Sequence, residues 1–154
     1  MILKKIISIE RVKVWDADID KWTAIDELAD LISSSSDGSE ANTLVDDILE
    51  REYKGSTGIG KGIAIPHART AGVKSLVGAL GVSRRGIDFE SEDGQPCHMV
   101  FLILAPPEES TTYLKALSAV AFIGKDEAIM SKLTSASSPD EVISVLEKVE
   151  SGNH

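Results

Sequence analysis

The chain of 154 residues has a single cysteine, Cys97, and no long apolar run. One cysteine excludes an internal disulfide and is compatible with a reducing compartment. No apolar run reaches the length of a membrane span, and residues 1–7 are too short for the apolar region of a signal peptide. These absences predict a cytoplasmic protein without membrane insertion.

Basic side chains are also scarce, since 16 Lys and Arg stand against 25 Asp and Glu, for a net charge of −9. This balance argues against binding nucleic acid or an anionic membrane by bulk attraction. The length and the 42% of hydrophobic residues suit one domain whose core needs no disulfide or metal. We expect a single domain over residues 1–150 and a disordered tail at 151–154.

Apolar spacing predicts both strands and helices along the chain. The expected elements are an extended arm or strand at 6–14, a helix from Thr23, a polar linker at Ser33–Gly38, a helix capped by Asn42 or Thr43, a strand at 73–82, a turn at 84–86, a strand buried on both faces at 98–105, and helices in the last third, the final one opening at Ser138-Pro139. Interleaved strands and helices favour an α/β fold: a sandwich with a mixed β-sheet flanked by helices.

A glycine-rich stretch, residues 55–62, leads through a short apolar segment to Pro66 and His67. Glycine lets the backbone approach a ligand, so such a loop can turn several N–H groups toward one anion. The glycine spacing fits neither a dinucleotide-binding motif nor a Walker loop. We expect Pro66 to end the regular structure and present His67.

Of the three histidines, only His67 has a context that suggests chemistry. His154 falls in the tail, and His98 follows Cys97 on a strand, where neighbours point to opposite faces; we therefore expect no metal and no cofactor. A phosphorylated imidazole needs one free ring nitrogen and donors for three phosphoryl oxygens. Several such donors lie near His67 in sequence: Arg51, Ser56, Thr57 and Arg69. The alternative is that His67 is an ordinary surface or packing residue.

Three segments together form a specific pattern. They are Arg51-Glu52, the stretch from Ser56 to His67 that ends in Ile63-Ala64-Ile65-Pro66-His67, and Asp93-Gly94-Gln95-Pro96 before an apolar strand. With them the chain resembles the enzyme IIA domains of the bacterial phosphoenolpyruvate-dependent sugar phosphotransferase system, of the fructose/mannitol type that includes nitrogen-regulatory IIA proteins. The resemblance implies that His67 accepts a phosphoryl group from the phosphocarrier HPr or its nitrogen-branch counterpart. It also implies that Arg51 steadies this group and that Ser56 and Thr57 line the site.

One position departs from the family, which usually has a His-Leu pair where this chain has Tyr113-Leu114. A tyrosine can donate a hydrogen bond to a phosphoryl oxygen, but it carries no positive charge near neutral pH. Tyr113 is thus either a phosphoryl-binding residue or a helix residue that packs near the site.

The resulting hypothesis is a phosphotransferase that carries a phosphoryl group on His67. The group would pass to a IIB protein in sugar transport, or serve as a signal to a regulated kinase or transporter in nitrogen regulation. The alternative, suggested by Tyr113, is a non-catalytic regulatory module of the same fold that binds partner proteins without phosphotransfer.

Overall fold

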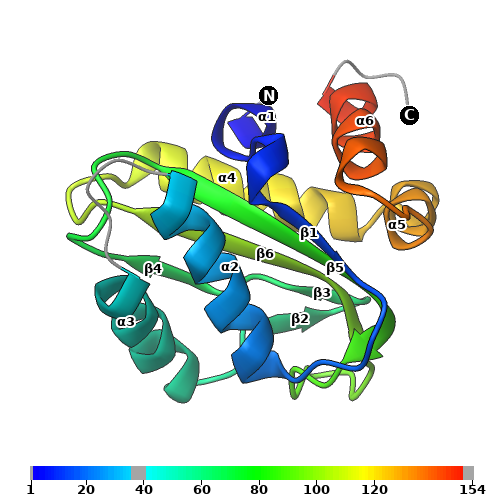
Figure 1. The fold of residues 1–154 in the computed structure, drawn as a ribbon, viewed down its shortest axis with the longest axis horizontal. Coiled ribbons are helices and arrows are strands. Elements are labelled where there is room, and N and C mark those ends of the chain that lie inside the picture. Colours follow the sequence, from blue (N-terminus) through cyan, green and yellow to red (C-terminus); the bar gives the residue numbers. More distant parts are fainter. Residues whose placement is uncertain (1, 36–40, 151–154) are drawn as a thin grey trace.

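The computed structural model describes residues 2–35 and 41–150; the predicted tail at 151–154 lies outside the described residues. The elements, in chain order, are α1 (Ile2–Ile6), a 3₁₀ helix η1 (Ile9–Arg11), β1 (Val12–Trp15), α2 (Lys21–Ser35), α3 (Ala41–Tyr53), β2 (Gly58–Gly60), β3 (Ile63–Ala64), β4 (His67–Arg69), β5 (Val77–Ile87), β6 (Cys97–Ala105), α4 (Thr111–Gly124), α5 (Glu127–Thr134) and α6 (Pro139–Glu150) (Figure 1).

The described strands form one mixed sheet in the order β1-β5-β6-β3-β2, and β4 also pairs with β6. The long strands β5 and β6 are antiparallel to each other. By contrast, β1 runs parallel to β5, and both β3 and β4 run parallel to β6. The mixed sheet that the sequence predicts is confirmed.

Strand β6 is the centre of the molecule because its side chains supply both halves of the core. Met99, Phe101 and Ile103 pack toward α1, α4, α5 and α6, whereas Val100 and Leu102 pack toward α2 and α3. All five are fully buried, as expected for a strand covered on both faces. Figure 1 shows α2 and α3 on one face of the sheet and the other helices on the opposite face, which confirms the predicted α/β sandwich.

The prediction of an extended arm or strand at 6–14 was wrong for its first part, because Ile6 belongs to helix α1 and residues 9–11 form the short helix η1. The buried residues Leu3, Ile6 and Ile7 have helical spacing, and burying this apolar side against the core outweighs the β-branched composition. Only Val12–Trp15 becomes a strand, with Val12 opposite Leu80 of β5.

The predicted serine linker begins too early, since α2 continues through Ser35. The hydroxyls of Ser33 and Ser35 donate to the backbone carbonyls of Asp30 and Leu31, at 3.2 and 2.6 Å. A serine can satisfy its hydroxyl in this way without ending the helix. Residues 36–38, the rest of the predicted linker, lie outside the described residues.

Residues 84–86 do not form a separate turn but belong to β5, which extends to Ile87. The register between β5 and β6 shifts between Val82 and Ile87, and Gly86 has a positive φ of 91° there. The irregular geometry that the sequence indicated is therefore a bulge within a strand. The predicted start of the last helix is confirmed: α6 begins at Pro139, and the N–H of Glu141 donates to Ser138 Oγ at 3.3 Å.

Pro66 does not end the regular structure. Ile63 and Ala64 pair with Met99 and Val100, and after Pro66 the pairing resumes in the same register, with His67 opposite Ile103. The carbonyl of Pro66 still accepts the N–H of Ile103 at 3.0 Å. Proline is tolerated here because it contributes only an acceptor to the pairing. His67 therefore lies on a strand, at a position that β6 determines.

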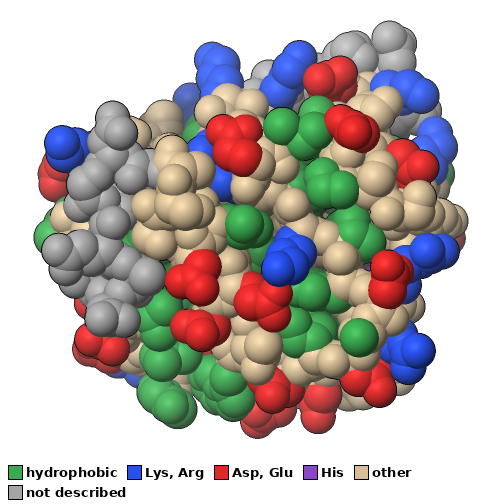
Figure 2. Space-filling model, viewed as in Figure 1, with side chains coloured by type: hydrophobic (Ala, Val, Ile, Leu, Met, Phe, Trp, Pro, Cys, Tyr) green, Lys and Arg blue, Asp and Glu red, His purple; other side chains and the backbone are tan. Residues whose placement is uncertain are grey.

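The face that carries α2 is unsuited to an anion. Figure 2 shows acidic side chains gathered over the centre of this face, and no described side chain seen there is a histidine. Asp26 and Asp30 of α2 are among its exposed residues. The candidate site lies elsewhere, at the edge of the sheet between α3 and α4.

Candidate functional site

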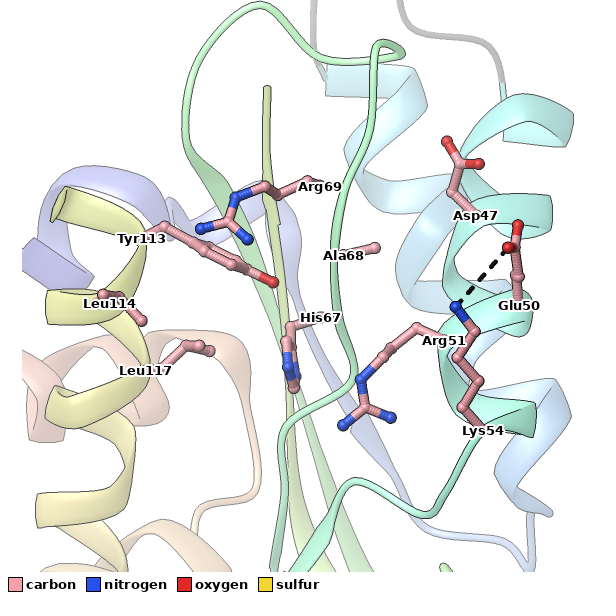
Figure 3. A pocket seen from close by; sticks show the side chains of 10 residues that line it. All are labelled: Asp47, Glu50, Arg51, Lys54, His67, Ala68, Arg69, Tyr113, Leu114 and Leu117. Carbon is pink, nitrogen blue, oxygen red and sulfur yellow. Dashed lines mark ion pairs between the residues drawn. The ribbon is translucent and has the colours of Figure 1, made fainter. Parts of the chain in front are cut away.

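Three elements far apart in the sequence surround a cavity of about 450 Å³ (Figure 3). They are the second half of α3, strand β4 and the first turns of α4. The cavity is lined by Asp47, Glu50, Arg51, Lys54, His67, Ala68, Arg69, Tyr113, Leu114 and Leu117. The structure thus brings the predicted residues Arg51, His67 and Tyr113 together around one space.

Among the described residues, the ring of His67 has a hydrogen-bond partner at Nδ1 alone. Its Nδ1 lies 2.6 Å from the backbone carbonyl oxygen of Ile65. A carbonyl can only accept, so Nδ1 carries the hydrogen and donates, and Nε2 of the neutral ring keeps its lone pair. This is the tautomer that makes Nε2 a nucleophile.

Burial lowers the pKa of His67, because an imidazolium is less well solvated there than in water. The positive charges of Arg51 and Arg69 lower the pKa further, whereas the hydrogen bond to Ile65 and the charge of Glu52 raise it. The net direction is downward from 6.5, so the neutral, nucleophilic ring predominates at neutral pH.

Arg51 reaches the cavity from the last turn of α3. Its Nη1 donates to the carbonyl oxygen of Gly55 at 3.0 Å, which fixes the guanidinium at the start of the glycine-rich loop. Lys54 lines the same wall and forms an ion pair with Glu50, at 3.9 Å, marked in Figure 3. A fixed guanidinium is well suited to binding phosphoryl oxygens.

Tyr113 forms the opposite wall with its ring centroid 6.0 Å from that of His67. The side chain is only 4% exposed, and its hydroxyl points into the cavity in Figure 3. Burial raises the pKa of Tyr113, although the charges of Arg69 and Arg51 oppose this shift. The phenol therefore keeps its proton at neutral pH and can act as a donor.

Arg69, which the sequence analysis counts among the donors near His67 without assigning it a role, lines the cavity. Its guanidinium carbon lies 4.8 Å from the Tyr113 ring centroid, and its Nε donates to the Glu109 carbonyl at 3.1 Å. A signal existed: residues two apart on a strand share a face, so His67 and Arg69 point the same way. The expectation that regular structure ends at Pro66 hid this alternation.

The structure gives Ser56 and Thr57 partners away from the cavity. The hydroxyl of Ser56 donates to the Phe89 carbonyl, and that of Thr57 donates to Glu52 Oε1 at 2.6 Å. Neither residue lines the cavity. The glycine-rich stretch itself folds into the β2–β3 hairpin, where Gly60, Lys61 and Gly62 all have positive φ.

The other candidates from the sequence have local partners. His98 Nδ1 lies 2.9 Å from the Ser83 carbonyl oxygen, on a strand away from the cavity. Within residues 2–35 and 41–150, no group of three or more His, Cys, Asp or Glu side chains is arranged to hold a metal ion. No helix in that same part of the chain has the length and hydropathy to cross a bilayer.

Comparison with known proteins places this chain in a family. Residues 5–149 match the family described as phosphoenolpyruvate-dependent sugar phosphotransferase system, EIIA 2. The chain belongs to this family. The match covers every element that surrounds the cavity.

Relatives of this EIIA 2 protein include both transport and regulatory proteins. The fructose-specific EIIABC component of Bacillus subtilis is 36% identical over 146 residues, which are 95% of this chain but only 23% of that protein. A crystal structure of the nitrogen regulatory protein IIA-Ntr from Neisseria meningitidis matches with a TM-score of 0.85 and 31% identity, covering 95% of this chain and 99% of the other.

The fold also matches a complex of enzyme IIA-mannitol with phosphorylated enzyme IIB-mannitol from Escherichia coli. The TM-score is 0.77 at 21% identity, with 91% of this chain and 96% of the other covered. At this identity the likeness concerns the fold alone.

Proposed function

We propose that this EIIA 2 protein is a phosphoryl carrier that accepts a phosphoryl group on Nε2 of His67 from an HPr-like phosphocarrier protein. The observation that carries the proposal is the hydrogen bond from His67 Nδ1 to the Ile65 carbonyl, which leaves Nε2 unprotonated beside Arg51 and Tyr113. The lowered pKa of His67 supports it, because a protonated ring has no lone pair to attack with.

In the transfer step, the lone pair of His67 Nε2 forms a bond to phosphorus as the bond from phosphorus to the donor's histidine nitrogen breaks. The electron pair of the broken bond returns to the donor nitrogen. The Nδ1 proton of His67 stays in its hydrogen bond to Ile65, so no proton leaves the ring. Passing the group onward reverses these roles, with His67 as the leaving group.

The three transferred oxygens need donors that require little rearrangement, because preorganised charge is the main contribution to such catalysis. We assign Arg51 and Tyr113 to this role and add Arg69, whose charge lies against the tyrosine ring. We assign Ser56 and Thr57 an indirect role: their hydrogen bonds to Phe89 and Glu52 hold the glycine-rich stretch, and they do not contact the phosphoryl oxygens. The chemistry then needs no metal.

Partner binding has to occur at the mouth of the cavity, since phosphoryl transfer requires contact between two protein surfaces. Leu114 lines the cavity and is 58% exposed, so it offers an apolar contact beside the reacting atom. The receiving partner is a IIB protein if the role is sugar transport, and a regulated kinase or transporter if the role is signalling. We propose that either exchange takes place in the cytoplasm.

The test is incubation with phosphoenolpyruvate, enzyme I and HPr, followed by intact mass measurement. We expect one phosphoryl adduct on the wild type and none on His67→Gln. The matched control His98→Gln, which changes a histidine outside the cavity, should keep the adduct. An unmodified wild-type protein, or an adduct that survives His67→Gln, would overturn the proposal.

The second candidate is a regulatory module that binds partners without phosphotransfer. Tyr113 favours it, because a neutral phenol stands where the family usually has an imidazole. This candidate predicts no adduct in the same experiment, together with binding of a partner protein that is unaffected by His67→Gln. The mass measurement thus decides between the two.

A further inference from the structure

A buried ion pair lies behind the β2–β3 hairpin, outside the cavity. Lys21 at the start of α2 and Glu52 near the end of α3 are 5% and 3% exposed. Lys21 Nζ lies 3.0 Å from Glu52 Oε2. Removing two charges from water is costly, so a buried ion pair is weak evidence of a role in stability and calls for another explanation.

The carboxylate of Glu52 holds Thr57 at two points. Its Oε2 accepts the backbone N–H of Thr57 at 2.9 Å, and its Oε1 accepts the Thr57 hydroxyl at 2.6 Å. Both bonds are buried, and Thr57 is 4% exposed. With Lys21 on the same oxygen as the backbone N–H, the carboxylate fixes both the position and the orientation of this residue.

Two further hydrogen bonds connect Thr57 with the reacting imidazole. The carbonyl of Thr57 accepts the N–H of Ile65 at 3.0 Å. The carbonyl of Ile65 then accepts His67 Nδ1–H at 2.6 Å. Pro66 follows Ile65 and has no N–H of its own. The bond from Ile65 N–H to Thr57 therefore anchors this segment on the side away from its pairing with β6.

We propose that Glu52, neutralised by Lys21, is a positioning residue that keeps the Ile65 carbonyl aimed at His67 Nδ1 and so keeps Nε2 free; this inference rests on the phosphoryl-carrier function proposed above. Glu52 does not line the cavity, and its carboxylate bonds to Thr57 and Lys21 rather than to His67. It acts through Thr57 and Ile65. An imidazole without such a partner favours the opposite tautomer, in which the hydrogen occupies Nε2 and blocks attack.

The experiment measures the His67 tautomer directly, from the ¹⁵N chemical shifts of its ring in the unphosphorylated full chain at pH 8. Glu52→Gln has the same shape but can no longer accept both Thr57 donors and neutralise Lys21. We expect wild type to show the Nδ1–H tautomer and Glu52→Gln a mixture. Single-turnover phosphoryl acceptance from phosphorylated HPr should slow at least about tenfold, since misplacement near 1 Å costs up to about 100-fold.

The matched control is Glu90→Gln, because Glu90 is an exposed carboxylate 3.7 Å from the same lysine. We expect this variant to keep the wild-type tautomer and rate. Thermal unfolding checks that each variant is folded. If Glu52→Gln does not fold, Thr57→Val, which loses one of the two bonds, is compared with Thr57→Ser, which keeps it.

The positioning role is overturned if folded Glu52→Gln keeps the wild-type tautomer or the wild-type rate. If Glu52→Gln does not fold, the same results in Thr57→Val overturn it. This failure is distinct from failure of the carrier function. The tautomer is read without phosphate, whereas the carrier function fails only if wild type gains no phosphoryl adduct.

Discussion

Replacing Tyr113 by phenylalanine removes a single oxygen atom from the cavity and tests whether that oxygen contacts the phosphoryl group. Tyr113 is 4% exposed, and its ring centroid lies 4.8 Å from Cζ of Arg69 and 6.0 Å from the ring centroid of His67. Phenylalanine preserves both contacts, so the walls of the cavity should stay in place. The free energy of unfolding should therefore fall by no more than about 1 kcal/mol, the centre of the range for point substitutions.

The magnitude follows from the hydrogen bond that is lost. A bond to a charged group contributes about 1.5–3 kcal/mol, and the lower end applies here because the donor is neutral and the cavity is open to solvent. About 1.5 kcal/mol in the barrier corresponds to acceptance that is roughly tenfold slower. Tyr113 keeps its proton across neutral pH because its pKa is raised, so the effect should not vary between pH 7 and 8.

The assay is rapid-quench transfer from phosphorylated HPr to the protein, followed in a single turnover. The control is Tyr53→Phe, the same chemical change at the other tyrosine, which is 74% exposed and does not line the cavity. Tyr53→Phe should retain the wild-type rate within about twofold. A Tyr113→Phe protein that accepts phosphate as fast as Tyr53→Phe would refute the assignment and favour a packing role.

Three further predictions test the site and the core. Phosphoryl acceptance should slow as pH falls, with a midpoint below 6.5 because the pKa of His67 is lowered. The neutral ring contributes to the free energy of unfolding above about pH 6.5, and this contribution is lost as pH falls through the lowered pKa. Unfolding of His67→Gln, measured against pH, should lack this step. Arg51→Gln should slow single-turnover acceptance about 100-fold, as loss of a preorganised donor does. The rate of Arg51→Lys should lie between those of wild type and Arg51→Gln, and an Arg51→Gln rate equal to that of wild type would contradict the role of Arg51. In the core, an added Cβ at Gly81 would lie 2.2 Å from the Trp15 ring, so Gly81→Ala should lower the free energy of unfolding by about 1–3 kcal/mol, measured by urea titration. The control Gly55→Ala should leave it unchanged, because an added Cβ there has no neighbour within 4 Å.

The fold class was predictable because its strongest signal is local. The apolar run of β6 requires burial on both faces, and helices to cover those faces occur before and after it. Predictions failed where the covering contacts decided the outcome. Residues 2–6 are helical because Leu3 and Ile6 find a core to pack against. The last turn of α2 includes Ser35, whose hydroxyl accepts a hydrogen bond from the distant Arg11.

By itself, the sequence determined the chemistry that the protein has available. Its one histidine after a glycine-rich stretch, the preceding Arg51 and the family pattern pointed to phosphohistidine, because these depend on residue types and short spacings. Only the tertiary structure decided which groups surround that histidine. The continuous register of β3 and β4 along β6 aims His67 and Arg69 at Tyr113. Thr57 instead donates its hydroxyl to Glu52, away from the cavity. Strand register and helix packing bring together segments that are far apart in the chain, so these contacts cannot be predicted from the local spacing of residues.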